Sequence, residues 1–208
     1  IGLRMGTDYA PYLANLFLFY YEHKWVMKTK ETNPQLARRF NKSVRYIDDL
    51  LTINNDGLMN KYMSDIYPKE LELKHENSQN DQHTTYLDLE INVVNNEIVT
   101  SLYDKRDDFP FTAINFPDLS GNIPQDASYG VFIAQTLRYA RACAMYNDFL
   151  SRTHRLRAQL VNQNFKHKNL IQKLKRWMNT SVKAKVLLRY GHSFQQILSD
   201  LNKVNEDG

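Results

Sequence analysis

Residues 43–54 read SVRYIDDLLTIN and place two adjacent aspartates, Asp48 and Asp49, between residues that favour β-strands. The alternation on both sides predicts a strand, a tight turn and a returning strand. Successive side chains of a strand point to opposite faces, so only a turn brings both carboxylates toward one site. Two acids this close repel each other unless a cation offsets the repulsion, and oxygen ligands suit Mg²⁺. A solvated hairpin tip is the simpler alternative, because Asp tolerates turns.

A helix is predicted upstream of this hairpin, from Tyr9 onward. Thr7 or Asp8 is its expected N-cap, and Pro11 fits in its first turn. A polar stretch at 28–34 is expected to follow it. Apolar residues recur at helical spacing, and the stripe expected to be buried consists of Leu13, Leu16, Phe17 and Tyr20.

Shorter elements are predicted on both sides of the hairpin. Helices are expected at 35–40 and 58–67, and Pro68 ends the second one. The alternation at 71–74 indicates a strand, which a polar loop at 77–83 follows. The first hundred residues therefore combine short strands with helices.

A second hairpin is predicted from residue 86. Residues 86–94 alternate between apolar and polar side chains, Asn95-Asn96 forms the turn, and 97–103 return as a strand. An irregular linker rich in Asp, Pro and Gly follows at 104–125. From residue 129 the periodicity is helical, with helices expected at roughly 129–152, 155–164, 167–178 and 193–205. The fold class is therefore α+β: an antiparallel sheet backed by helices, followed by an all-helical region.

Charge divides the chain into an acidic front and a basic back. Residues 1–136 hold 13 Lys and Arg against 19 Asp and Glu, whereas residues 137–208 hold 14 against 4. Lys and Arg supply most of the sequence-independent affinity for nucleic acid, and metal sites need clustered carboxylates. A solvated basic helix face would give the same pattern, so charge alone leaves both readings open.

Composition also bears on location. Cys143 is the single cysteine, so no internal disulfide forms, and we expect an intracellular protein of the nucleus or cytoplasm. No apolar run reaches the roughly 18 residues that a membrane span needs, so no membrane partner is expected. The oligomeric state is left open.

Three motifs resemble those of reverse transcriptases, the RNA-directed DNA polymerases of retroelements. Tyr46-Ile47-Asp48-Asp49 is similar to the palm motif in which an aromatic and a variable residue precede two aspartates. Residues 2–15, GLRMGTDYAPYLAN, resemble the glycine-rich loop and helix of that family. Met5 stands where many members have Gln, which is familiar from Penelope-like and related elements, and Asp8 and Ala10 replace the usual Pro and Ser.

The third motif, Tyr86-Leu87-Asp88-Leu89 with its return strand, resembles the hairpin that grips the primer end. The run at 103–109, YDKRDDF, is similar to a Tyr-Arg-Lys segment of Penelope-like enzymes, although a charged surface loop would look the same. The resemblance implies three regions: the C-terminal part of the palm at 1–105, a linker at 106–128 and a basic helical thumb or connection region at 129–208.

The resemblance implies nucleotidyl transfer from a dNTP to the 3′-hydroxyl of a DNA primer on an RNA template. Two Mg²⁺ ions would act with Asp48 and Asp49, and one ligand aspartate would come from an upstream segment, so we expect this fragment alone to be inactive. Met5, Gly6 and Tyr46 would bind the nucleotide, and Tyr86, Leu87 and Asp88 would grip the primer. The arginines implied to meet nucleic acid are Arg138, Arg141, Arg152, Arg155 and Arg157.

Other readings remain open at this stage. An inactive polymerase-like module that binds RNA or a hybrid duplex would keep the same elements. A metal-dependent nuclease or phosphatase would recruit further ligands, for which His75 and His83 are the nearest candidates. Lys74 could donate a proton to the leaving pyrophosphate, or it could be an ordinary solvated lysine.

Overall fold

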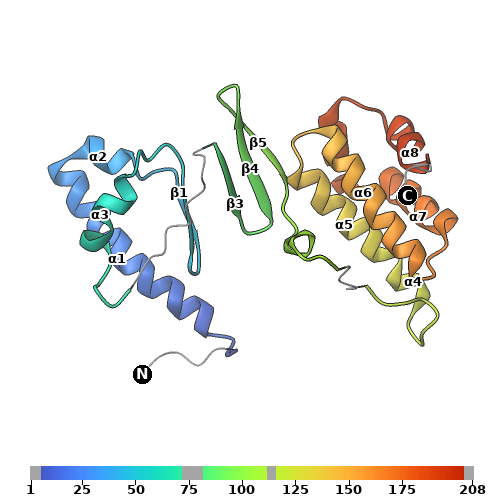
Figure 1. Ribbon diagram of the computed structural model, residues 1–208, viewed down its shortest axis with the longest axis horizontal. Coiled ribbons are helices and arrows are strands. Elements are labelled where there is room, and N and C mark those ends of the chain that lie inside the picture. Colours follow the sequence, from blue (N-terminus) through green and yellow to red (C-terminus); the bar gives the residue numbers. More distant parts are fainter. Residues whose placement is uncertain (1–5, 72–81, 112–115, 204–208) are drawn as a thin grey trace. The chain divides into compact units, whose positions relative to one another are not determined.

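The computed structural model describes residues 6–71, 82–111 and 116–203, which fall into two compact units, 1–77 and 78–208. Both units combine helices with antiparallel strands, and the C-terminal region is helical (Figure 1). The α+β prediction is therefore confirmed. The three-stranded sheet belongs to the same unit as the C-terminal helices. The proposed division into palm, linker and thumb stays a prediction.

The first unit is a hairpin with three helices. The strands β1 (Ser43–Tyr46) and β2 (Asp49–Thr52) pair antiparallel, with Tyr46 opposite Asp49, as the alternation predicted. The helices are α1 (Ala10–Thr32), α2 (Pro34–Arg38) and α3 (Leu58–Ile66), and the last two match their predicted positions. Their small core is centred on three buried residues, Phe40, Ile66 and Tyr67.

The face of α1 that packs is not the predicted one. The stripe of Leu13, Leu16, Phe17 and Tyr20 is exposed, and Leu16 retains 63% of its accessible surface. The core instead receives Leu18, Tyr21 and Trp25 from this helix. Apolar residues lie on every side of α1 between residues 12 and 21, so periodicity alone does not select the packed face.

The ends of α1 also differ from the prediction. Tyr9 is the N-cap and makes no side-chain cap, while the backbone N–H of Ala10 donates to the carbonyl of Thr7 at 3.1 Å. Thr7 and Asp8 are therefore not the cap. The helix continues to Thr32, through most of the polar stretch, because its lysines extend into solvent on an exposed face.

The second unit begins with a three-stranded meander in the order β3-β4-β5. Its strands are β3 (His83–Tyr86), β4 (Leu89–Val94) and β5 (Glu97–Leu102). The single strand predicted at 86–94 is wrong, because Leu87 and Asp88 form a turn that splits it. The Asn95-Asn96 turn is confirmed, and both residues have positive φ, 51° and 64°. Of the strand predicted at 71–74, residues 72–74 lie outside the described residues.

Helices complete the second unit. They are η1 (Lys105–Asp108), α4 (Gln125–Ser128), α5 (Gly130–Ala142), α6 (Tyr146–Asn162), α7 (His167–Thr180), η2 (Val182–Tyr190) and α8 (Phe194–Asn202). The helix predicted over 129–152 is wrong, since the chain leaves α5 at Cys143. Tertiary contacts with β5 account for the end of the helix. The hydroxyl of Thr100 donates to the carbonyl of Ala142 at 2.7 Å, and the backbone carbonyl of Thr100 accepts from the N–H of Ala144.

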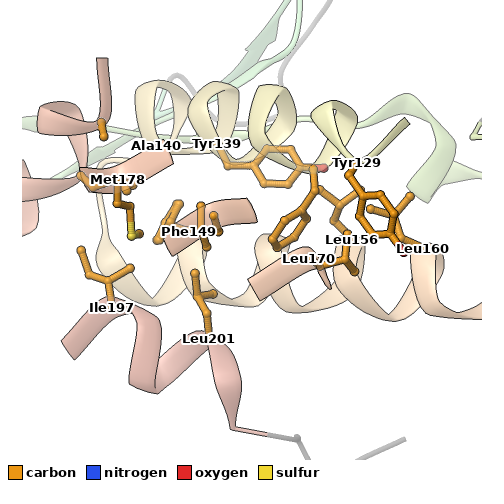
Figure 2. Packing of buried hydrophobic residues seen from close by; sticks show 14 of the residues in the cluster. Tyr129, Tyr139, Ala140, Phe149, Leu156, Leu160, Leu170, Met178, Ile197 and Leu201 are labelled. Atoms are coloured by element: carbon orange, nitrogen blue, oxygen red, sulfur yellow. The ribbon is translucent and has the colours of Figure 1, made fainter. Parts of the chain in front are cut away.

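The main core lies inside the helical part of this second unit. Figure 2 shows side chains of α5, α6, α7 and α8 converging on it, among them Tyr139, Phe149, Leu170 and Ile197. Leu102 of β5 is buried in the same cluster, which joins the sheet to the helices. The sheet and the basic helices are therefore one packed body.

Candidate functional site

The two aspartates of the first hairpin lie at a two-residue turn. Tyr46 ends β1, Ile47 and Asp48 form the turn, and Asp49 begins β2. Ile47 has φ 53°, which is rare for a β-branched residue and costs on the order of 1–3 kcal/mol. Such strained residues concentrate at functional sites, so the turn is a candidate for one.

The carboxylates of Asp48 and Asp49 are exposed, and neither forms an ion pair or side-chain hydrogen bond with any described residue. The other Asp-Asp pair of the chain behaves differently. Asp107 pairs with two arginines, and Asp108 accepts a hydrogen bond from the hydroxyl of Tyr103 at 2.6 Å. The hairpin pair therefore keeps its oxygens available for a cation, whereas the pair in η1 does not.

Arg45 connects this turn to α1 through hydrogen bonds. Its Nη1 donates to the carbonyl of Ile47 at 3.0 Å and to Oδ1 of Asn15 at 2.8 Å. Its Nε donates to Oε1 of Glu22 at 2.7 Å, and the Arg45 side chain is only 11% exposed. One arginine therefore connects the strained turn to two positions on α1.

The network continues into the small core. The hydroxyl of Tyr67 donates to Oε1 of Glu22 at 2.6 Å. Burial, followed by this hydrogen bond, raises the pKa of Tyr67, so the phenol keeps its proton. Glu22 thus holds Arg45 on one side and Tyr67 on the other. The position of the turn relative to α1 depends on this set of charged and polar contacts.

The residues implied to bind a nucleotide are only partly described. Gly6 adopts φ 87°, a conformation that side chains rarely accept, and a Cβ there would meet nothing within 4 Å. Tyr46 is exposed beside the two aspartates, with 57% of its surface accessible. Met5 lies outside the described residues, as do Lys74 and His75.

The residues that the resemblance implies at the primer grip form a turn of the same kind in the second unit. Tyr86 ends β3, Leu87 has φ 56°, and Leu89 begins β4 opposite Tyr86. Asp88 in this turn forms an ion pair with Arg138 of α5 at 2.8 Å. The three residues therefore lie together at one tight turn that α5 holds in place.

The arginines implied to meet nucleic acid differ in their surroundings. Arg152 and Arg155 both pair with Asp107, at 2.7 Å for Arg155. Arg157 is buried and donates to the carbonyls of Leu201 and Lys203 at the end of α8. Arg141 is exposed and forms no ion pair within the described part of the chain. Arg157 therefore has a structural role in addition to any other.

A basic surface that the sequence reasoning did not single out lies on α7. No acid occurs from residue 149 to residue 199, a stretch that holds 11 Lys and Arg. Three of these cations, Lys168, Lys175 and Arg176, are exposed at helical spacing on α7 and make no ion pair with the described residues. The sequence signal that indicates this surface is the stretch without Asp or Glu from residue 149 to residue 199.

The described residues hold no group of three or more Asp, Glu, His or Cys side chains that could bind a metal ion. Two exposed carboxylates on adjacent residues fit part of a Mg²⁺ site, because Mg²⁺ is often held by one or two carboxylates together with water and phosphate. His83 belongs to the other unit, where its Nε2 lies 3.0 Å from Oε1 of Glu90. The hairpin thus offers two of the ligands that a two-metal site needs.

Comparison with known proteins identifies no relative: no family model, curated protein or solved structure matches the chain. Within the described ranges, no helix is long and apolar enough to cross a membrane.

Proposed function

We propose that this chain is the C-terminal palm and thumb part of a reverse transcriptase that transfers nucleotides to a primer on an RNA template. The proposal is supported most by the contact between two segments that carry the resemblance. Asn15 ends the glycine-loop segment, and Arg45 precedes the aspartate turn. The guanidinium of Arg45 donates to both the side chain and the carbonyl of Asn15, at 2.8 and 3.2 Å. Segments that are 30 residues apart therefore meet at the base of the turn.

In this proposal Asp48 is a direct metal ligand and Asp49 an ancillary one. Mg²⁺ bound there would stabilise the attacking and leaving oxygens of in-line nucleotidyl transfer. Arg45 connects the turn to α1 through its hydrogen bonds to Ile47 and Asn15. The placement of the ligands matters because a shift of about 1 Å can cost roughly a hundredfold in rate. The ring of Tyr46 lies exposed next to the ligands, where a nucleotide base or sugar can contact it.

Nucleic-acid backbone contacts are assigned mainly to the exposed cations of α7. Lys168, Lys175 and Arg176 carry positive charge that no described acid neutralises, whereas Arg152 and Arg155 share Asp107. Phosphate contacts position a duplex without reading its sequence, so a row of exposed cations is sufficient. Arg141 and Arg138 remain secondary candidates.

The test is Mg²⁺-dependent primer extension on an RNA template by a longer form of the chain that supplies the upstream aspartate and fingers. Asp48→Asn should abolish extension, because an amide is a far poorer ligand than a carboxylate. The matched control is Asp65→Asn, which removes an exposed carboxylate of α3 in the same unit and should leave extension unchanged. Extension that survives Asp48→Asn would refute the assigned metal site.

The second candidate function is an inactive module that binds RNA or a hybrid duplex. Its support is the basic face of α7, which requires no catalysis. A well-folded parent that binds hybrid duplex but extends no primer would favour this module over the polymerase.

A further inference from the structure

A cavity of about 270 Å³ lies in the second unit, beside η1 and α6. Its wall contains two guanidinium groups, Arg106 and Arg155, and two phenyl rings, Phe109 and Phe111. The remaining lining residues are Asp104, Asp107, Pro110 and Gln159. The volume is close to the lower end of the range for small-molecule sites, so it can hold one compact ligand group.

The two arginines of the cavity wall each pair with an aspartate of the same wall. Arg106 pairs with Asp104, at 2.8 Å for its Nε, and Arg152 and Arg155 together pair with Asp107. The hydrogen bond from Arg106 keeps the pKa of Asp104 below its usual range, so that carboxylate stays ionised. Arg152, which does not line the cavity, shares Asp107 with Arg155, so Asp107 keeps a cationic partner without Arg155. Nη1 of Arg106 is buried and has no hydrogen-bond acceptor among the described residues, which leaves a donor to satisfy.

Two aromatic rings lie exposed beside these arginines. The ring centroids of Phe109 and Phe111 are 5.3 Å apart, and their planes differ by 32°. They retain 49% and 63% of their accessible surface, although apolar rings of this size are normally buried. Exposed aromatic rings next to arginines are the arrangement on which unpaired bases stack in single-stranded nucleic-acid sites.

We propose that this cavity binds one nucleotide unit of a single-stranded nucleic acid, with its phosphodiester at Arg106 and Arg155 and its base against Phe109 and Phe111. Because Arg152 also pairs with Asp107, the guanidinium of Arg155 can turn to a phosphodiester without leaving that carboxylate unpaired. A paired base in a duplex cannot offer its face to the rings. This site lies in the unit that lacks the Asp48-Asp49 turn, so its test does not depend on the proposed polymerase function.

The test measures fluorescence anisotropy of a labelled oligothymidylate of about twelve nucleotides with the full 208-residue chain. Replacing both rings, Phe109→Ala with Phe111→Ala, should weaken binding about tenfold, because base–aromatic stacking contributes that order of affinity per base. An abasic oligonucleotide of the same length should bind the parent and the variant equally. A second variant with leucine at both positions keeps apolar volume without a ring and should show the same loss.

Arg155→Gln tests the phosphate side of the site. Arg152 still holds Asp107 in this variant, so the fold is expected to persist. Binding of both the base-bearing and the abasic oligonucleotide should weaken several-fold, and the loss should shrink as salt rises. Arg38→Gln, an exposed arginine of α2 outside the cavity, makes the same change in net charge and should leave both affinities unchanged.

Thymidine monophosphate distinguishes a strand from a free nucleotide as the source of the ligand. It should compete with the oligonucleotide only at much higher concentration. The proposal is overturned if thymidine monophosphate competes at equal concentration. It is likewise overturned if both ring variants, folded by circular dichroism, bind the oligothymidylate as tightly as the parent.

Discussion

Ile47 and Leu87 occupy the same position in two different hairpins. Each follows the last tyrosine of a strand, each has a positive φ near 55°, and each precedes an aspartate. Branched and bulky side chains disfavour this conformation, so surrounding contacts must hold the turns in place. In the first hairpin Arg45 binds the carbonyl of Ile47, and in the second Arg138 binds Asp88.

Leu87→Gly is expected to stabilise the second unit by about 0.5–1 kcal/mol. Glycine adopts positive φ without strain, and Leu87 loses little burial because 45% of it is exposed. Urea denaturation followed by circular dichroism measures the change. Leu87→Ala is the control, since it removes the same side chain but keeps the strain, and it should not stabilise the unit. A destabilising Leu87→Gly would mean that the turn is not strained.

Arg45→Ala is expected to destabilise the first unit by about 2–3 kcal/mol, somewhat less than for a fully buried pair. The variant leaves Glu22 without its cation and removes the donors to Asn15 and Ile47. Hydrogen exchange across residues 43–52 measures the loss. Arg38→Ala, an exposed arginine on α2, should cost less than about 0.5 kcal/mol. Equal effects of the two substitutions would contradict the role given to Arg45.

At the scale of elements, α8 is attached to α6 through polar contacts as well as through the core. Arg157 donates to the carbonyls of Leu201 and Lys203, and the hydroxyl of Tyr146 donates to Oδ2 of Asp200 at 2.9 Å. A cation at the C-terminus of a helix satisfies its free carbonyls and opposes its dipole. The end of α8 is therefore attached to α6 by the hydrogen bonds of Arg157.

Acid is expected to weaken the second unit. Burial, and then the charge of Arg157, lowers the pKa of both His154 and His167 below the value of about 6.5 that an unfolded chain has. The neutral rings therefore contribute stability in full above pH 6.5, and that stability is lost as the pH falls through their lower folded values. Urea denaturation at pH 7.5 and pH 5.5 measures it.

His154→Gln should reduce this dependence on pH. His23→Gln, a substitution of an exposed histidine on α1, should not change it. A second unit that is equally stable at both pH values in the parent would contradict the proposed effect of the two partly buried rings.

Local patterns predicted the strands and turns better than the packed faces. The strands and the turn at residues 43–54 follow from local alternation, although the strained turn is also held by the contacts of Arg45 with α1. The packed face of α1 could not be predicted from apolar spacing, because it includes the polar residues Asn15 and Glu22, which bind Arg45. The end of α5 could not be predicted either, because Thr100, some 40 residues away, fixes it.

The candidate site follows the same rule. Asp48 and Asp49 were identified from the motif Tyr46-Ile47-Asp48-Asp49, and the structure places them at an exposed turn. The role of Arg45 was not predicted. Nothing in the sequence around it indicates that it pairs with residues 23 and 30 positions upstream. The resemblance implied a set of arginines in the second unit, and only the structure separates those bound to Asp107 from the exposed cations of α7.

At the scale of the whole molecule, two units of unequal core predict two unfolding transitions. The first unit has three buried core residues, whereas the second has an extended cluster that includes Leu156, Leu170 and Ile197. Leu170→Ala should lower only the more stable transition, by roughly 2–5 kcal/mol, and Ile66→Ala only the less stable one. Differential scanning calorimetry measures both. A single transition that both substitutions shift would show that the units unfold together.

The most direct test of the central claim is whether a divalent ion binds the Asp48-Asp49 turn of the 208-residue chain. Mn²⁺ replaces Mg²⁺ on oxygen ligands and broadens amide resonances near its site. We predict selective broadening at residues 46–50, which Asp48→Asn with Asp49→Asn removes. The second Asp-Asp pair, at 107–108, should stay sharp because arginines and Tyr103 occupy its oxygens. Equal broadening at both pairs, or none at the turn, would contradict the assignment of the hairpin as a metal site.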